Sequence, residues 1–158
     1  MAVSATTRPR RPGEADGREY YFLTEEEFSR RVGGAEFLEY VVYVSGQRYG
    51  TLNAEVERII GRGRSCILEL ETAGARRVKE LRPDSVTIFI AAPTFDELRR
   101  RLEERATESA GEIGERLDLA RRQTEEAHDF GHVVTNDDVE RAVAELEEIV
   151  GREVESRR

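Results

Sequence analysis

The sequence predicts an α/β protein with a layered architecture and a mostly parallel sheet. Two observations support this class. Short, nearly uninterrupted apolar runs alternate with helical patterns along the chain, and strands buried on both faces of a parallel sheet have this character. From residue 66 onward the expected order is strand, helix, strand, helix, helix, strand, helix, which is typical of layered α/β folds.

Four segments have the composition of strands. The stretch 35–44, AEFLEYVVYV, is rich in aromatic and β-branched residues. The stretches 65–71 (SCILELE) and 85–92 (SVTIFIAA) are short apolar runs, and 132–136 (HVVTN) is similar to them. We therefore expect a strand at each of these four places.

Three helix starts are marked by capping boxes, in which Ser or Thr is followed three residues later by Glu. The pairs are Thr24 with Glu27, Thr94 with Glu97, and Ser109 with Glu112. The last helix has an apolar stripe with a period of 3.6 residues. Its members are Val139, Ala142, Val143, Leu146, Ile149 and Val150. Residues 151–158 are expected to form a frayed tail.

Composition limits the class of protein. A length of 158 residues suits one compact domain. The net charge of -8 would repel nucleic-acid phosphates, so we expect no nucleic-acid partner. No apolar run approaches the roughly 20 residues of a membrane span, and residues 1–20 lack the apolar core of a signal peptide. The single cysteine, Cys66, excludes an internal disulfide. We expect a cytoplasmic protein without a membrane partner.

The amino-terminal segment is unusually basic for an acidic chain. Residues 8–12, RPRRP, hold three arginines and two prolines. Because proline fixes φ, the loop has fewer conformations, and its guanidinium groups could bind a phosphate through forked hydrogen bonds. Tyr20 and Tyr21 could add hydroxyl donors. Taken alone, the pattern favours a solvated surface loop.

The wider context of this loop resembles the guanylate kinase family. Residues 4–22, SATTRPRRPGEADGREYYF, are similar to the family signature S-x-T-T-R-x-x-R-x-G-E followed by G-x-x-Y. Further similar segments follow in the family's order and extend the resemblance over nearly the whole chain. They are EFLEYVVYVSGQRYGT (36–51), CILELETAGA (66–75), IFIAAP (88–93), RRLEERATES (100–109) and VTNDD (134–138).

The resemblance implies a P-loop NTPase-like three-layer core, incomplete at the N-terminus, with a small mixed-sheet GMP-binding subdomain and a helical lid. The implied division is a GMP-binding region at 3–62, core at 63–99 and 117–150, a lid at 100–116 and a tail at 151–158. The implied reaction is transfer of the γ-phosphate of ATP to GMP, giving ADP and GDP, with Mg²⁺ accompanying ATP. A homodimer is also possible.

The resemblance assigns the GMP site one residue at a time. The phosphate would be held by Arg8, Arg11, Tyr20 and Tyr49, and the guanine would be read by Ser4, Glu39 and Thr51. Guanine presents a ring N–H and an exocyclic amine on one edge, so one carboxylate can accept both bonds, whereas adenine offers no such pair. Glu69 and Glu71, at the end of an apolar stretch, would orient Mg²⁺ and the nucleotide. From the residues alone, Glu39 would be an outward-facing strand residue, and the other two would be solvated.

A second set of arginines would act on ATP. In the resembled family the lid arginines stabilise the transferring phosphoryl group, which here implies catalytic roles for Arg101, Arg105 and Arg116. Arg101 and Asn136 would also contact ATP. The alternatives from the residues are helical ion pairs of Arg101 with Glu97 and Glu104, and an N-cap role for Asn136.

The chain departs from the family in several places. Glutamates stand at 69 and 71 where aspartates are usual, Ala73 stands where Gln is usual, and ERAT (104–107) replaces G-R-G-T. The turn VSGQRYGT (44–51) is one residue longer than the common form. These changes leave the predicted phosphate clamp intact.

The P-loop pattern G-x-x-x-x-G-K-[ST] is not found in the sequence, whose only lysine, Lys79, follows Val78. Three explanations stay open. The chain is truncated or its start is misplaced, which we favour because the guanine-reading set persists; it is a non-catalytic module that binds GMP or a phosphorylated peptide; or another chain supplies the missing part. We expect the isolated chain to be unstable or to self-associate, because a sheet without a central strand exposes unpaired backbone.

Overall fold

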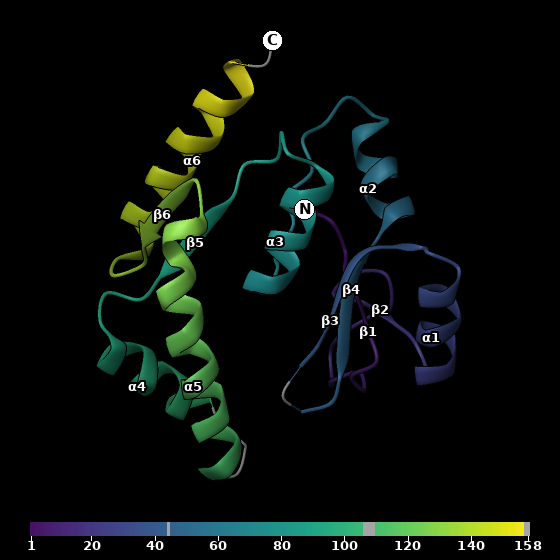
Figure 1. The fold of residues 1–158 in the computed structure, drawn as a ribbon, viewed down its shortest axis with the longest axis horizontal. Coiled ribbons are helices and arrows are strands. Elements are labelled where there is room, and N and C mark those ends of the chain that lie inside the picture. Colours follow the sequence, from purple (N-terminus) through teal and green to yellow (C-terminus); the bar gives the residue numbers. More distant parts are fainter. Residues whose placement is uncertain (44, 106–109, 157–158) are drawn as a thin grey trace. The chain divides into compact units, whose positions relative to one another are not determined.

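The computed structural model describes residues 1–43, 45–105 and 110–156. These residues form two compact units, Met1–Pro83 and Asp84–Arg158. Both units combine helices and strands (Figure 1), so the predicted α/β class is confirmed. In the described ranges, no helix is long and apolar enough to cross a membrane.

The first unit is built on a four-stranded mixed sheet with the order β2-β1-β4-β3. The strands are β1 (Ala5–Thr6), β2 (Tyr21–Phe22), β3 (Phe37–Val42) and β4 (Arg48–Leu52). β1 pairs with β2 in parallel, whereas the β1–β4 and β3–β4 pairs are antiparallel. The strand predicted at 35–44 is therefore confirmed as β3.

Three helices pack around this sheet. They are α1 (Glu25–Gly33), α2 (Asn53–Ile60) and α3 (Thr72–Leu81). The predicted start of α1 is confirmed, because Thr24 Oγ1 accepts a hydrogen bond from the Glu27 N–H at 3.1 Å. Figure 1 shows α1 and α3 on opposite sides of the sheet. Phe28 of α1 stacks on Phe37 with 4.4 Å between ring centroids, and Val78 of α3 packs with Leu38.

The β3–β4 pairing contains an irregularity that decides which way β3 side chains point. Phe37 pairs with Leu52 and Glu39 pairs with Thr51, so β3 holds one extra residue between these pairs. Strict alternation would place Phe37 and Glu39 on the same face. The extra residue, Leu38, separates them: Phe37 packs toward α1, while Glu39 shares a face with Thr51.

The strand predicted at 65–71 is wrong, because this extended segment has no ladder of backbone hydrogen bonds. Among the described residues, the backbone hydrogen bond that joins it to a distant segment runs from the Ala2 N–H to the Ile67 carbonyl at 2.9 Å. A strand needs repeated bonds of this kind with a neighbour. The segment is still apolar in its packing, since Cys66, Leu68 and Leu70 pack against the cluster of Leu38, Val56 and Val78.

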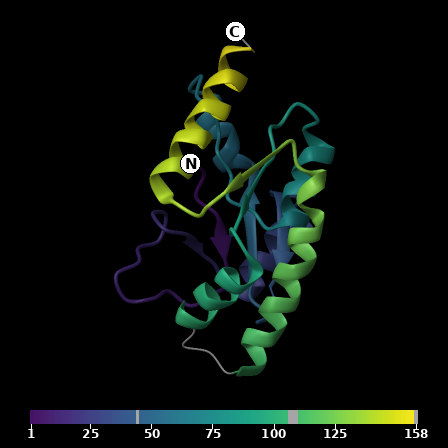
Figure 2. The ribbon, with the colours of Figure 1, turned by 90° about the vertical axis from the view of Figure 1, so that its left-hand side faces the viewer.

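The second unit pairs two parallel strands with three helices. The elements are β5 (Ile88–Ala91), α4 (Phe95–Arg105), α5 (Ala110–Glu125), a 3₁₀ turn (Glu126–Asp129), β6 (His132–Thr135) and α6 (Val139–Glu155). α6 lies beside β6, where Val134 is fully buried against Ala142 and Ile149. Figure 2 shows α4 next to α5, and the Arg121 guanidinium lies 4.8 Å from the ring centroid of Phe95. The strands predicted at 85–92 and 132–136 are confirmed.

Helix ends in this unit test the remaining sequence predictions. The Glu97 N–H donates to Thr94 Oγ1 at 3.1 Å, which confirms the start of α4. Ser109 lies outside the described residues, and α5 begins at Ala110. The frayed tail predicted at 151–158 is wrong as far as Glu155, where α6 ends. Gly151 weakens the helix by only about 1 kcal/mol relative to alanine, which is too little to end it.

Candidate functional site

The basic loop after β1 folds around a buried guanidinium group. The Arg8 side chain is only 8% exposed. Its Nη1 and Nη2 atoms donate to the two carboxylate oxygens of Glu14 at 3.1 and 2.7 Å, and Nη1 also donates to the Pro9 carbonyl at 2.8 Å. This forked ion pair raises the pKa of Arg8 and lowers the pKa of Glu14. Both groups are therefore charged at neutral pH.

Arg11 contributes to the same loop in a different way. Its backbone N–H donates to Glu14 Oε2 at 2.7 Å, while its side chain is exposed. The Arg11 charge also helps to lower the pKa of Glu14, after the larger effects of hydrogen bonds from Arg8 and the Arg11 backbone. Glu14 thus accepts hydrogen bonds from both Arg8 and Arg11 and holds the loop together. Glu14 is part of the sequence motif, but its role was not predicted.

Aromatic rings surround the Arg8 guanidinium. Its Cζ lies 5.3 Å from the ring centroid of Tyr20 and 5.7 Å from that of Phe22, which is the range of cation–π contacts. Tyr20 meets Tyr49 edge to face with 6.0 Å between centroids. Burial raises the pKa of Tyr20, and the nearby Tyr49 and Glu69 raise it further. The structure therefore brings Arg8, Tyr20 and Tyr49 together, with Glu69 nearby.

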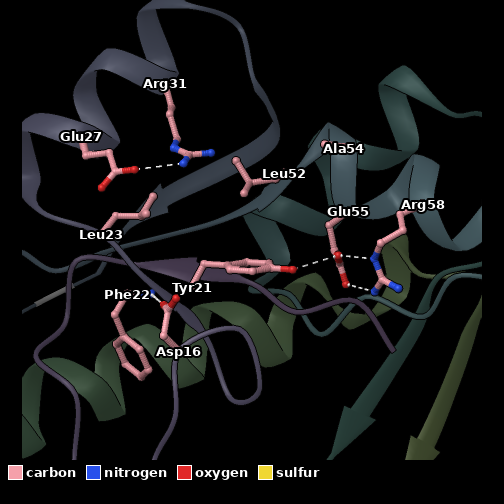
Figure 3. A pocket seen from close by; sticks show the side chains of 10 residues that line it. All are labelled: Asp16, Tyr21, Phe22, Leu23, Glu27, Arg31, Leu52, Ala54, Glu55 and Arg58. Atoms are coloured by element: carbon pink, nitrogen blue, oxygen red, sulfur yellow. Dashed lines mark hydrogen bonds and ion pairs between the residues drawn. The ribbon is translucent and has the colours of Figure 1, made fainter.

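Tyr21 does not join this cluster. Adjacent residues of a strand point to opposite faces, and the Tyr21 hydroxyl donates to Glu55 Oε2 at 3.2 Å. Figure 3 shows this bond, together with the two hydrogen bonds from Arg58 to Glu55 at 2.8 and 2.9 Å. The suggestion that Tyr21 adds a phosphate donor is therefore wrong.

The cavity of about 420 Å³ drawn in Figure 3 is lined by none of the predicted site residues. Its most buried charge, Glu55, also accepts the Val3 N–H at 3.1 Å. Both Glu55 oxygens accept hydrogen bonds from Arg58, and these bonds, followed by that from Val3, lower the pKa of this carboxyl. Glu55 ties the amino-terminal segment and β2 to α2, and both of its oxygens are engaged by protein groups. Among the described residues, the unpaired buried polar atom on this cavity is Arg31 Nε.

A second buried carboxylate behaves very differently. Glu39 on β3 is only 5% exposed, and its cross-strand partner Thr51 is 1% exposed. Glu39 Oε1 and Thr51 Oγ1 are both buried without a hydrogen-bond partner among the described residues. Burial raises the pKa of Glu39, and the neighbouring hydroxyl and N–H of Thr51 offset that rise only in part. Buried polar atoms without partners are rare, and a bound ligand is one way in which such atoms are satisfied.

Two glycines that we did not predict shape the surroundings of Glu39. At Gly50 on β4, a Cβ atom would lie 2.7 Å from the Glu39 carbonyl oxygen. At Gly74 on α3, a Cβ atom would lie 2.7 Å from Glu39 Oε2. The sequence held a signal for Gly74, because a glycine inside a helical pattern is unfavourable for the helix and often has a packing reason.

The remaining predicted GMP residues lie at the edges of this region. Ser4 directly precedes β1 and accepts the Tyr21 N–H through its carbonyl at 2.9 Å. Glu69 is exposed, and Glu71 is the residue before α3, where its side chain does not cap the helix. Within the described ranges, no three His, Cys, Asp or Glu side chains gather as a metal site. A divalent cation here would need further oxygen ligands from a nucleotide.

The predicted catalytic arginines belong to the second unit. Arg101 Nε donates to Glu97 Oε1 at 2.7 Å, which is the predicted helical ion pair, whereas Glu104 pairs with Arg100 at 2.5 Å. Hydrogen bonds from Arg100 and then Arg101 lower the pKa of Glu97 to about 2. Arg116 lies half-buried on α5. Arg105 ends α4, and its side chain lies outside the described part.

Asn136 follows β6, and its N–H donates to the Ala91 carbonyl at 2.7 Å. It is not the N-cap of α6. That position is taken by Asp138, whose Oδ1 accepts the Arg141 N–H at 2.9 Å. The N-cap alternative for Asn136 is therefore wrong, because the helix begins two residues later than that alternative requires.

Comparisons with known proteins agree on one family. The family profile described as "Guanylate kinase" matches residues 1–153. The chain is 45% identical to the guanylate kinase of Symbiobacterium thermophilum over 95% of this chain and 71% of that protein. It is 49% identical to the guanylate kinase of Rubrobacter xylanophilus over 96% and 78%. The crystal structure of guanylate kinase from Anaplasma phagocytophilum is similar with a TM-score of 0.81, at 31% identity, over 96% of this chain and 74% of that one.

Proposed function

This chain belongs to the guanylate kinase family, and we propose that it takes part in transferring the γ-phosphate of ATP to GMP, giving ADP and GDP. The observation that carries the proposal is the buried Glu39 carboxylate, whose Oε1 has no hydrogen-bond partner in the part of the chain that the structure describes. It shares one sheet face with the cluster around Arg8. Thr51 pairs with Glu39, and Tyr49, two residues earlier on β4, contacts Tyr20.

The Arg8 guanidinium is suited to bind the GMP phosphate while it keeps its pair with Glu14. An arginine side chain has five N–H donors. Glu14 and Pro9 use three of them, all on Nη1 and Nη2. The Nε–H and the second Nη2–H share the other edge of the guanidinium, where two parallel bonds to phosphate oxygens can form. Glu14 therefore acts as a positioning residue that fixes the fork.

Tyr20 and Tyr49 complete this half of the proposed site. The Tyr20 ring packs beside the Arg8 guanidinium, and the Tyr49 ring packs against Tyr20. Arg11 adds a positive charge at an exposed position of the same loop. Tyr49 and Thr51 lie roughly 7 Å apart along an extended strand. A nucleoside monophosphate can span that length, so its phosphate and its base would each meet one end.

Glu39 is proposed to select guanine. Its ionised carboxylate would accept the ring N–H and the exocyclic amine of guanine, and the Thr51 hydroxyl and Ser4 would contact the same base. Adenine would place a ring acceptor against the carboxylate and leave the buried charge unpaired. Because an unpaired buried charge is costly, the site should discriminate strongly against AMP.

The residues of the second unit are proposed for the ATP side of the reaction. Arg101, Arg105 and Arg116 would stabilise the charge of the transferring group, and Asn136 would contact the adenine. Mg²⁺ would accompany ATP and neutralise its phosphates, with Glu69 and Glu71 as fitting oxygen donors. The cytoplasmic location and the homodimer stay predictions.

The proposal is tested by coupled-enzyme turnover of GMP with ATP, with calorimetric titration of GMP in parallel. Turnover that needs both nucleotides and is slow with AMP is the expected result. GMP binding without turnover would favour a non-catalytic binding module. A chain that binds a phosphorylated peptide in preference to GMP would contradict the proposed acceptor site.

A further inference from the structure

We propose that Gly74 is a positioning residue for the Glu39 carboxylate and thereby a determinant of guanine selectivity. This inference rests on the function proposed above, because it concerns how the same carboxylate is held. Gly74 makes no contact with the reacting atoms. Its part is to leave space, on the first turn of α3, that one oxygen of Glu39 occupies.

The geometry shows how little space there is. A Cβ atom at position 74 would lie 2.7 Å from Glu39 Oε2 and 3.4 Å from its Cδ, whereas Cβ atoms essentially never approach another atom within 3.0 Å. The next neighbour, Leu70 Cβ, would be at 3.6 Å, which is an ordinary contact. The carboxylate is therefore the group that excludes a side chain at this position.

The backbone does not explain a glycine here. Gly74 lies inside the helix Thr72–Leu81 and is not among the residues with positive φ. Glycine is a poorer helix former than alanine, so the helix alone would favour alanine at this position. The first turn is also the end where the helix dipole favours a negative charge. The close approach of the Glu39 carboxylate to the first turn of α3 explains why a glycine stands there instead of an alanine.

This contact holds the position of the carboxylate. Oε2 lies against α3 at Gly74, while Oε1 and Thr51 Oγ1 are buried without a hydrogen-bond partner among the described residues. Oε2 is the far end of a flexible side chain, so it can shift at small cost. Glu39 is 5% exposed, and its backbone is held where the adjoining Leu38 packs against Val56 and Val78, so the shift stays within the buried site. A methyl group at 74 would push the carboxylate off its position and misplace the oxygens that read guanine.

The test compares GMP and AMP affinities by calorimetry for Gly74→Ala, Glu39→Asp, the double variant and the unaltered chain. Gly74→Ala should lower the ratio of GMP to AMP affinity by about tenfold or more, with AMP affinity nearly unchanged. Glu39→Asp withdraws the carboxylate by one methylene, so it should relieve the clash. The double variant should therefore discriminate as well as Glu39→Asp alone, and the two effects should be non-additive.

Gly151→Ala is the matched control. Gly151 also lies inside a helix, and a Cβ there would meet nothing within 4 Å. This variant should keep the GMP to AMP ratio. An unchanged ratio in Gly74→Ala, or independent effects in the double variant, would overturn the inference while leaving the proposed function intact.

Two further outcomes are also decisive. An unaltered chain that binds GMP and AMP equally would overturn the proposed function and this inference with it. If Gly74→Ala does not fold, the double variant decides, because it should recover folding when the carboxylate is the obstacle. A double variant that also fails to fold would show that another group occupies the space.

Discussion

The two units of the chain differ in whether their charged side chains are buried. The buried polar or charged residues in the described part all lie in the first unit, and they include Arg8, Glu39 and Glu55. In the second unit, Arg100 is 57% exposed and pairs with Glu104, which is 60% exposed, along a helix surface. Buried charges are costly unless bonded, whereas exposed helical pairs contribute little. Substitutions should therefore have large effects on the first unit and small effects on the second.

The largest effect is expected from Arg8→Ala. Hydrogen bonds to charged groups contribute about 1.5–3 kcal/mol each, so losing the fork should weaken GMP binding on the order of 100-fold. Calorimetric titration with GMP measures this change. Arg10→Ala, at an exposed position in the same loop, is the control and should bind GMP normally. Equal losses in the two variants would show that the loop acts only through its overall charge.

Glu39→Gln should abolish the preference for GMP over AMP. The amide keeps the size of the side chain but presents an N–H where guanine also presents one, so discrimination should fall by roughly 100-fold. Glu57→Gln, on the exposed face of α2, should keep it. Retained selectivity in Glu39→Gln would remove Glu39 from base recognition.

The same substitution should stabilise the free protein. Burial raises the pKa of Glu39 above its ordinary value of 4.5. The folded state therefore holds this proton at a pH where the unfolded state has lost it, and stability falls as pH rises from about 4.5 through the raised pKa. Glu39→Gln should raise the thermal midpoint at neutral pH and flatten its dependence on pH. A lower midpoint at neutral pH would contradict this account of the buried charge.

Binding of GMP should show the opposite dependence on pH. Only the ionised carboxylate accepts both guanine hydrogens, so GMP affinity should rise as pH increases through the raised pKa of Glu39. AMP is the control, because its phosphate ionises in the same range, and the ratio of the two affinities isolates the carboxyl. A ratio that stays constant as pH rises above 4.5, the ordinary value for this carboxyl, would count against Glu39 as the titrating group.

The smallest effect is expected from Arg101→Ala. Arg101 bonds Glu97, which keeps its second partner Arg100 when the first is removed. Thermal melting and GMP affinity should change little, while turnover with ATP should fall if the proposed role is right. Arg99→Ala, at an exposed position of the same helix, is the control. A large loss of stability in Arg101→Ala would show that the residue is structural.

Local signals in the sequence were sufficient for much of the fold. Thr24 and Thr94 cap helices because a hydroxyl three residues before a glutamate N–H needs no distant partner. The segment 65–71 shows the limit. Its apolar composition agrees with the packing of the half-buried Cys66, Leu68 and Leu70. It did not predict that Ile67 is 54% exposed, and it could not provide a neighbouring strand. Residues past Val150 stay helical because a single glycine does not outweigh good helix formers around it.

The candidate site depends on information that no local pattern holds. Alternation in β3 would group Glu39 with Phe37, and only the extra residue in the pairing with β4 turns the carboxylate to the face of Thr51. Likewise, the motif around Arg8 predicted a phosphate clamp but not that Glu14 would occupy one edge of the guanidinium. Both features arise from contacts between segments that meet only in the folded unit.

The most direct measurement is calorimetric titration of the unaltered chain with GMP, AMP and guanosine. If the Arg8 cluster binds a phosphate and Glu39 reads its purine, GMP should bind at least about tenfold more tightly than either of the others. AMP would lack the base contacts, and guanosine would lack the phosphate contacts. Equal affinities for GMP and AMP, or for GMP and guanosine, would contradict the account.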